Sequence, residues 1–486
     1  MNSNSNIKNK TIKNLIWRFA ERCGAQGISF IVSIILARLL APEDYGVIAI
    51  VTVFITILQV FVDSGLGSAL IQKKDADDLD FSTVFYFNIF WCCILYIGIF
   101  IISPYIAAYF NTQSLTSVIR VLSLTIVISG VKNIQQAFVS KKMIFKKFFF
   151  STLIGTICSA IVGLFLAYKG YGVWALVVQQ VLNSTIDTCI LWITVKWRPK
   201  LQFSFVRLKG LFSYGWKLLL STLINTIYNE VRQLIIGKMY SPLDLAYYNR
   251  GKQFPNFIVA NINTSIDSVL LSAMAEYQND KERIKSMTRR SIMISSYIMW
   301  PLMFGLMAIG EPLIKLILTE KWIQCVPYMY IFCFICGMQP IHTSNLNAIK
   351  AIGCSGLYLK MEIIKKSIGI IIILISAQYG VFAIGIGSVI YTLIASIINA
   401  YPNRQLLDYS YFEQVRDILP SFLLAFIMGI IVYFVPLICL TDYLVIPTQI
   451  VVGIIIYLLG SIALKLDCFY FLVNTMKNMK SINLNH

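Results

Sequence analysis

Five polar residues recur at intervals of three or four along the first apolar stretch of the chain, a spacing that places them on one face of a helix. They are Arg18, Arg22, Gln26, Ser29 and Ser33. An ionisable group at the centre of a bilayer costs about 2.5 to 3.5 kcal/mol on insertion scales, so this row should face protein or water instead of lipid. The chemistry it predicts is the binding of a polar solute in a hydrated space.

Three more rows of this kind follow, and a shift of about 200 residues relates the four rows in pairs. The first row is matched by Lys217, Ser221, Asn225, Tyr228 and Arg232. A second row, Thr52, Thr56, Gln59 and Asp63, is matched by Asn256, Ala260, Asn263 and Asp267. We infer a central cavity between these four helices, with a cationic bias, which also includes Glu21, Glu230, Arg250 and Lys252.

The same charged residues also allow an interpretation in which they stabilise the structure and bind no ligand. Arg18 or Arg22 would pair with Asp63, and Lys217 with Asp267, as ion pairs within the helix bundle. For a single residue the two interpretations are close, whereas for the four rows as sets we favour the cavity.

The elements that must position these rows are transmembrane helices. The 486 residues are 57% hydrophobic and only 13% charged, against about 25% charged in soluble domains. Apolar runs long enough to cross a bilayer recur along the whole chain, and they are too continuous for alternating barrel strands. Together with turn signals they predict an all-α fold with about fourteen spans, near residues 12–40, 44–72, 83–110, 115–138, 149–168, 172–195, 211–239, 244–275, 287–310, 324–349, 358–378, 380–402, 418–440 and 444–466.

The formal net charge of +18 is concentrated in alternate connections between the predicted spans. The N-terminal segment and every second connection are rich in Lys and Arg, as in residues 141–147, 196–209 and 281–290. Short cytoplasmic loops carry this excess, so both termini are predicted to be cytoplasmic. Attraction of the basic loops to lipid headgroups accounts for the charge, and no nucleic acid partner is predicted.

An internal duplication organises the spans. Residues 37–44 (ARLLAPED) correspond to residues 237–244 (GKMYSPLD), and residues 171–175 (YGVWA) correspond to residues 379–383 (YGVFA). Between these matches, Asp63, Ser64, Ser68 and Ala69 correspond to Asp267, Ser268, Ser272 and Ala273. The prediction is two six-helix lobes, residues 1–205 and 206–410, related by a pseudo-twofold axis along the membrane normal, with two further helices in residues 411–486.

Other chemistry finds little support in the sequence. The eleven cysteines lie mostly inside apolar runs, and Cys333 and Cys336 form a lone CxxC pair within one of them, so neither a disulfide framework nor a metal site is predicted. His342 is expected to have a packing role. The chain has no GxxxxGK[ST] loop, hence no direct use of ATP, and no cofactor is expected.

The stretch from Leu36 to Gly46 (LARLLAPEDYG), followed by Phe61 to Gln72 (FVDSGLGSALIQ), resembles the opening of the polysaccharide transporter family, the Wzx-type flippases, and in particular its colanic-acid-exporter branch. These motifs occupy about the first 75 residues, while hydropathy and the duplication extend the likeness over most of the chain. The resemblance implies the fold of the multidrug/oligosaccharidyl-lipid/polysaccharide exporter superfamily. It also implies transport of undecaprenyl-diphosphate-linked oligosaccharides across the bacterial inner membrane, beside polymerase and chain-length machinery.

For such a substrate, the resemblance implies two groups of ligands and a group of coupling acids. Cations would replace the hydration of the diphosphate, and amides would bind the sugars. The cations are Arg18, Arg22, Lys217 and Arg232, and the amides are Gln26, Asn225, Asn256 and Asn263. Coupling to Na⁺ or protons would use Glu21, Asp63, Glu230 and Asp267.

Two other functions stay open. A multidrug exporter of the same superfamily would be expected to have an acidic or apolar cavity, which the cationic bias disfavours. A membrane-embedded polymerase or glycosyltransferase would need a large external loop or a carboxylate cluster at the interface. Asp78 and Asp80 form a DxD by spacing, but they lie in an acidic run that we interpret as a solvated cytoplasmic turn.

Overall fold

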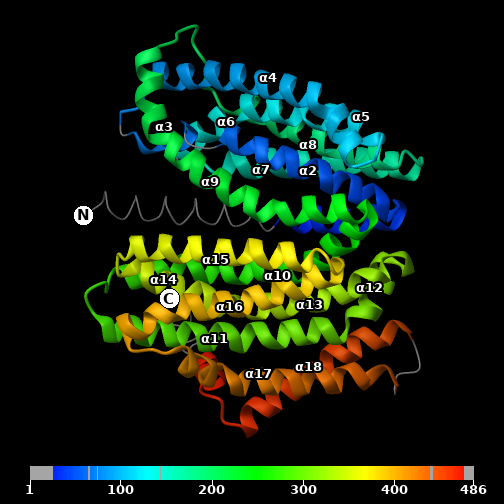
Figure 1. The fold of residues 1–486 in the computed structure, drawn as a ribbon, viewed down its shortest axis with the longest axis vertical. Coiled ribbons are helices and arrows are strands. Elements are labelled where there is room, and N and C mark those ends of the chain that lie inside the picture. Colours follow the sequence, from blue (N-terminus) through cyan, green and yellow to red (C-terminus); the bar gives the residue numbers. More distant parts are fainter. Residues whose placement is uncertain are drawn as a thin grey trace, which may run out of the picture. The chain divides into compact units, whose positions relative to one another are not determined.

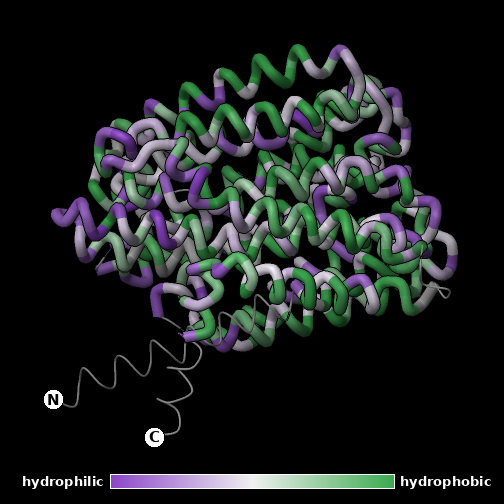
Figure 2. Tube along the Cα trace, turned by 90° about the horizontal axis from the view of Figure 1, so that it is seen from below, coloured by the Kyte–Doolittle hydropathy of each residue, from purple (hydrophilic) through white to green (hydrophobic). Residues whose placement is uncertain are grey.

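The structure is a computed structural model that describes residues 24, 26–63, 66–73, 75–142, 144–437 and 442–474. These residues form helices joined by short connections, with no strand among them. Hydrophilic residues gather mainly toward the helix ends, and the stretches between them are predominantly hydrophobic (Figure 2). Two compact units divide the chain, Met1–Ala246 and Tyr247–His486, and each is described by itself.

The first unit begins with a helix over Gln26–Leu39. Its other helices are α2 (Pro42–Asp63), α3 (Leu66–Gln72), α4 (Asp78–Tyr109), α5 (Ser114–Leu122), α6 (Leu124–Lys142), α7 (Lys146–Tyr168), α8 (Val173–Thr194) and α9 (Phe205–Met239). Helices α7 and α8 run side by side, α6 packs against α4 and α8, and α2 packs against α9 (Figure 1).

A capping box and ion pairs stabilise the turn before α4. Asp77 caps this helix by accepting from the backbone N–H of Asp80, whose side chain in turn accepts from the N–H of Asp77. The Asp80 carboxylate is fully buried and pairs with Lys73 at 2.6 Å and with Arg207 at 3.3 Å. The expectation of a solvated acidic turn is therefore wrong for Asp80, because two basic residues from outside the run enclose it.

A close backbone approach in the first unit involves the duplicated Pro motif. Pro42 begins α2 and Pro242 begins α10 (Pro242–Ala275), matching the predicted repeat. A Cβ atom on Gly46 would lie only 1.8 Å from the carbonyl oxygen of Pro242. Only glycine fits at position 46, since the opposing atom is backbone and cannot rotate away.

The second unit contains most of α10 and the rest of the described chain. Its elements are α11 (Lys281–Ala308), α12 (Gly310–Leu318), η1 (Glu320–Cys325), α13 (Val326–Gly337), α14 (Gln339–Ala351), α15 (Ser355–Ser376), α16 (Val381–Leu407), α17 (Tyr411–Phe434), η2 (Val435–Leu437) and α18 (Asp442–Ala463), followed by helical residues 467–474. Helix α11 packs along α17, α15 along α16, and α17 along α18.

Aromatic residues fill the core of this second unit. The Trp300 side chain is 2% exposed and its ring contacts those of Phe304 and Phe422, with centroids 5.5 and 4.7 Å away. A Cβ atom on Gly337 would come within 2.5 Å of the same indole, so this glycine lets α13 approach it. Part of the apolar surface of these helices therefore packs against other helices and does not face lipid.

The predicted fold class, an all-α polytopic membrane protein, is confirmed. Ten helical stretches of the described residues are long and apolar enough to cross a membrane. Helix Gln26–Leu39 and the long helices α9, α10 and α15 cover the remaining predicted spans, which is consistent with fourteen. The repeat boundaries after residues 205 and 410 stay predictions, because the compact units follow packing, and α9 packs within the first unit.

Candidate functional site

Much of the predicted cavity lies outside what the structure describes. Arg18, Glu21 and Arg22 precede the described residues. The backbone at four further positions is helical, but their side chains are not described: Asp63, Lys217, Asn263 and Asp267. The predicted ligand set can therefore be followed only in part.

Helix α9 carries the largest described part of the predicted cavity. Asn225 is exposed, whereas Glu230 and Arg232, one to two turns further on, are half-buried. The Glu230 carboxylate accepts a hydrogen bond from Gln233. The Nε of Arg232 is buried and has no hydrogen-bond partner in the described part of the chain. A buried guanidinium N–H without a hydrogen-bond partner favours the binding of an anionic acceptor.

The polar row of α2 lies in the same unit as that of α9, and the two helices pack together. Thr52 is exposed and donates to the carbonyl of Ile48, while Thr56 and Gln59 are half-buried. Gln26, at the start of the first described helix, is exposed. The structure thus brings together two of the four helices predicted to line the cavity.

The row on α10 belongs to the second unit. Asn256 is exposed, and its side-chain oxygen lies 3.5 Å from the Cys336 thiol, which donates to it. Arg250 is buried, with its guanidinium 4.8 Å from the centre of the Trp322 ring and bonded to Gln253. Arg250 therefore packs inside the second unit, where it stacks on an aromatic ring.

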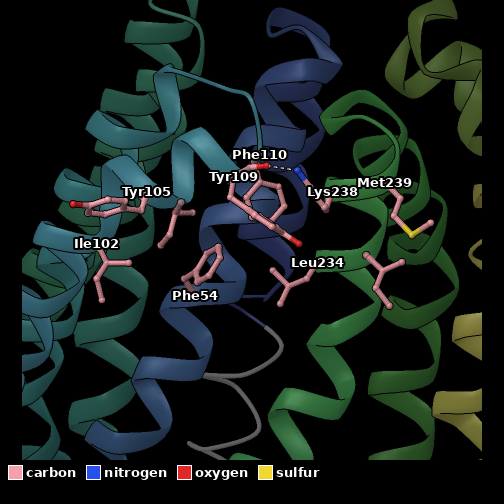
Figure 3. Close-up of a pocket in the computed structure, with 10 residues that line it drawn as sticks. Phe54, Ile102, Tyr105, Tyr109, Phe110, Leu234, Lys238 and Met239 are labelled. Carbon is pink, nitrogen blue, oxygen red and sulfur yellow. Dashed lines mark hydrogen bonds between the residues drawn. The ribbon is translucent and has the colours of Figure 1, made fainter.

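A pocket of about 520 Å³ lies beside the last turns of α4 and α9 and the middle of α2. Phe54, Tyr105 and Leu234 contribute to its apolar wall (Figure 3). The Lys238 ammonium lies at this wall, donates to the carbonyl of Tyr109 and sits 4.2 Å from the centre of that ring. Its single cation is already engaged, so this pocket adds little to the predicted ligand set.

Sequence reasoning missed an ion pair inside the first unit. Lys132 of α6 and Asp187 of α8 lie 2.6 Å apart, with side chains 21% and 9% exposed. Asp187 is the one charge in its predicted span, and Lys132 lies in the interior of its own, a signal that could have identified both. The second oxygen of Asp187 is buried without a hydrogen-bond partner among the described residues.

In the second unit, hydrogen bonds between uncharged side chains join helices. His342 of α14 and Asn399 of α16 are hydrogen-bonded, with Nδ1 and Nδ2 2.9 Å apart. Nearby, Asn345 accepts from Asn403 at 2.6 Å and from Gln414 at 3.0 Å. These contacts agree with a packing role for His342.

Cysteine and acidic residues form no metal centre within the described ranges, where no group of three or more His, Cys, Asp or Glu side chains could hold an ion. Cys333 and Cys336 are buried free thiols inside α13. What the described site residues can do chemically is bind: they offer amides and guanidinium groups to a polar ligand.

Known proteins resemble this chain in sequence. A family model described as "Polysaccharide biosynthesis protein" matches residues 35–327. The lipopolysaccharide biosynthesis protein WzxC of Escherichia coli (strain K12) is 23% identical over 92% of this chain and 87% of its own length. The succinoglycan biosynthesis transport protein ExoT of Rhizobium meliloti (strain 1021) is 22% identical over 71% of this chain and 70% of its own.

Solved structures share the fold. The lipid II flippase MurJ in an inward closed conformation superposes with a TM-score of 0.74 at 16% identity, over 92% of this chain and 98% of that one. An inward-facing multidrug resistance transporter of the MATE family, of the MOP superfamily, gives a TM-score of 0.62 at 17% identity, over 79% of this chain and 94% of that one.

Proposed function

Because the chain belongs to the polysaccharide biosynthesis protein family, we propose that it is a flippase for a polyprenyl-diphosphate-linked oligosaccharide. It carries the headgroup of this lipid across the bacterial inner membrane by alternating access, for the assembly of a surface polysaccharide. Relatives named for lipopolysaccharide and succinoglycan biosynthesis, and the fold shared with a lipid II flippase, support transport over enzymatic catalysis.

The structural observation that supports this proposal most directly is the buried Nε of Arg232, which has no hydrogen-bond partner among the described residues. A membrane helix that buries a guanidinium N–H without a partner loses about 1 to 3 kcal/mol unless a ligand or water accepts from it. The oxygens of a diphosphate are suitable acceptors, and arginine binds them more specifically than lysine because of its planar fork. The half-buried position of Arg232 leaves it within reach of a ligand.

The remaining residues of the predicted cavity divide by chemistry. In this proposal the cations bind the diphosphate, the amides bind sugar hydroxyls, and the polyprenyl chain stays in the bilayer. The cations are Arg18, Arg22, Lys217 and Arg232; the amides are Gln26, Asn225, Asn256 and Asn263. Ion coupling falls to four acids, Glu21, Asp63, Glu230 and Asp267, and flipping that is insensitive to both pH and Na⁺ would contradict this role.

The same proposal sets the orientation. Both termini lie in the cytoplasm, since the alternating basic connections belong on that side. Substrate then enters from the leaflet where glycosyltransferases complete it, and leaves to the polymerase and chain-length machinery on the other side.

A vesicle assay tests the proposal. The full-length protein is reconstituted with a fluorescent polyprenyl-diphosphate oligosaccharide, and the label exposed to an external quencher is followed over time. We expect Arg232→Gln to slow flipping about tenfold, the equivalent of one charge-assisted hydrogen bond. The matched control is Arg283→Gln on α11, which removes an arginine that stacks on Tyr277 at 3.7 Å.

Two results would overturn the cationic role. One is a wild-type flipping rate in folded Arg232→Gln protein. The other is unchanged transport after Arg22 and Lys217 are neutralised together. Export of cationic drugs without transport of the lipid would instead establish the multidrug alternative.

A further inference from the structure

A cavity of about 490 Å³ lies in the second unit beside the early turns of α11, and none of the predicted substrate-binding residues lines it. One face of α11 forms most of its wall, with Ser286, Arg289, Arg290, Met293 and Ile294. The short helix that follows α18 closes the other side, with Asp467, Cys468 and Phe471.

The wall changes from polar to apolar along α11. Ser286, Arg289 and Arg290 come first, and Met293 and Ile294 follow toward the middle of the helix. With a rise of 1.5 Å per residue, this change takes place over about 12 Å. Headgroup and acyl chain follow one another in the same order in a membrane lipid.

The charges of the cavity are not equally available. Arg289 is committed to Asp417, since its Nε and Nη2 both donate to that carboxylate at 2.7 Å. The hydroxyl of Tyr409 donates to the same carboxylate at 2.8 Å. Arg289 and Asp417 therefore neutralise one another and are held in place.

Two charges in the wall remain uncommitted. The Arg290 guanidinium stacks over Phe471 at 4.7 Å and makes no ion pair with any residue that the structure describes. Asp467 is exposed and likewise forms no ion pair within the described ranges. The wall of the cavity thus offers one cation, from α11, and one carboxylate, from the short helix.

We propose that this cavity binds the headgroup of a zwitterionic phospholipid that bears a primary ammonium. Its phosphate accepts from Arg290, its ammonium donates to Asp467, and an acyl chain lies against Met293 and Ile294. A lipid with only negative charge would place that charge beside Asp467, and a quaternary ammonium has no N–H to donate to it.

The position of the cavity suits a lipid of the cytoplasmic leaflet. It adjoins the basic start of α11, which contains Lys281, Arg283 and Lys285. In the closing helix, Tyr470 and Phe471 remain 43% and 38% exposed. Exposed aromatic rings of this kind are typical of the membrane–water interface.

Lipid retention by the full-length protein tests the proposal. The detergent-purified protein is incubated with equimolar phosphatidylethanolamine, phosphatidylglycerol and phosphatidylcholine, and bound lipid is quantified by native mass spectrometry. We expect phosphatidylethanolamine to be retained about tenfold over each of the others, the equivalent of one charge-assisted contact. Arg290→Gln should lose that retention, and Asp467→Asn should lose only the preference over phosphatidylglycerol.

The controls separate this site from general affinity for lipid. Arg283→Gln removes an arginine of α11 that stacks on Tyr277, in the turn before the helix, and does not line the cavity. This variant should retain lipid as the wild type does. Arg290→Lys keeps the charge and should recover part of the binding. Equal retention of all three lipids by the wild type, or unchanged retention in Arg290→Gln, overturns the proposal.

Discussion

The two units join equivalent helices by different chemistry. In the first unit α6 and α8 are linked by the ion pair of Lys132 and Asp187, and in the second unit α14 and α16 are linked by the neutral pair of His342 and Asn399. Under the predicted duplication α6 corresponds to α14 and α8 to α16. Both links lie about two to three turns before the ends of their helices.

The difference shows that the two units join these helix pairs by contacts of different charge. Each pair of helices is joined by a polar contact, but only the contact in the first unit is an ion pair. Two ions within a membrane lose hydration, and only their mutual attraction compensates for it. Uncharged groups lose less hydration free energy than ions when they are buried. In the second unit a further hydrogen bond between amides joins Asn345 on α14 to Gln414 on α17. The first unit should accordingly be the more sensitive to loss of one partner.

The largest effect is expected when Lys132 is replaced by Met. Asp187 is then left charged and 91% buried without its partner, since its side chain is 9% exposed. Removing one member of a buried ion pair costs about 3 to 5 kcal/mol. Thermal unfolding of the purified protein in detergent should show this as a large fall in Tm.

A double variant sharpens this test. Lys132→Met combined with Asp187→Leu removes both charges and should recover most of the lost stability, because an apolar pair of similar volume replaces the ions. If the double variant stays as unstable as the single one, the ion pair is not the source of the effect.

A smaller effect is expected in the second unit from His342→Leu. This change leaves the amide of Asn399 without its partner in a largely buried place, where Asn399 is 1% exposed. Loss of such a neutral hydrogen bond costs about 1 to 2 kcal/mol. The same unfolding experiment checks it, and a loss as large as that of Lys132→Met would remove the contrast between the units.

Sequence reasoning predicted the helices well because the bilayer dictates their length and polarity. Long apolar runs and alternating basic connections are local signals, so the spans could be placed without knowledge of packing. The division after Ala246 could not be predicted in this way, because it depends on α9 packing against α2.

The candidate site was less predictable for the same reason. Periodicity assigns a residue to a face of its helix but does not say what lies opposite. Arg250 was expected to line the cavity, yet it is covered by Trp322, more than seventy positions later. Lys132 and Asp187, 55 positions apart, become partners only when α6 and α8 pack together.

The smallest expected effect concerns the N-terminal caps of one helix in each unit. The start of α4 in the first unit has ionisable Asp77 as its N-cap residue, and the start of α17 in the second has the hydroxyl of Ser410, with Glu413 completing the capping box. The backbone N–H of Asp80, together with the charge of Arg207, holds the pKa of Asp77 below its usual value of 3.8. The Asp77 cap is thus complete above that value and is lost as the pH falls through the lowered pKa.

Hydrogen exchange of the first turn of α4 in nanodiscs measures this loss. Asp77→Asn caps a helix without titrating, so it serves as the reference at each pH. Between about pH 5 and about pH 3 the wild type should lose protection relative to this variant. The first turn of α17 should keep the part of its cap in which the Ser410 hydroxyl accepts from the N–H of Glu413, and should lose only the reciprocal bond to the Glu413 carboxylate, whose pKa is also lowered by its hydrogen bonds from Ser410. A ratio of wild type to variant that is the same at both pH values would mean that Asp77 does not stabilise α4 through its charge.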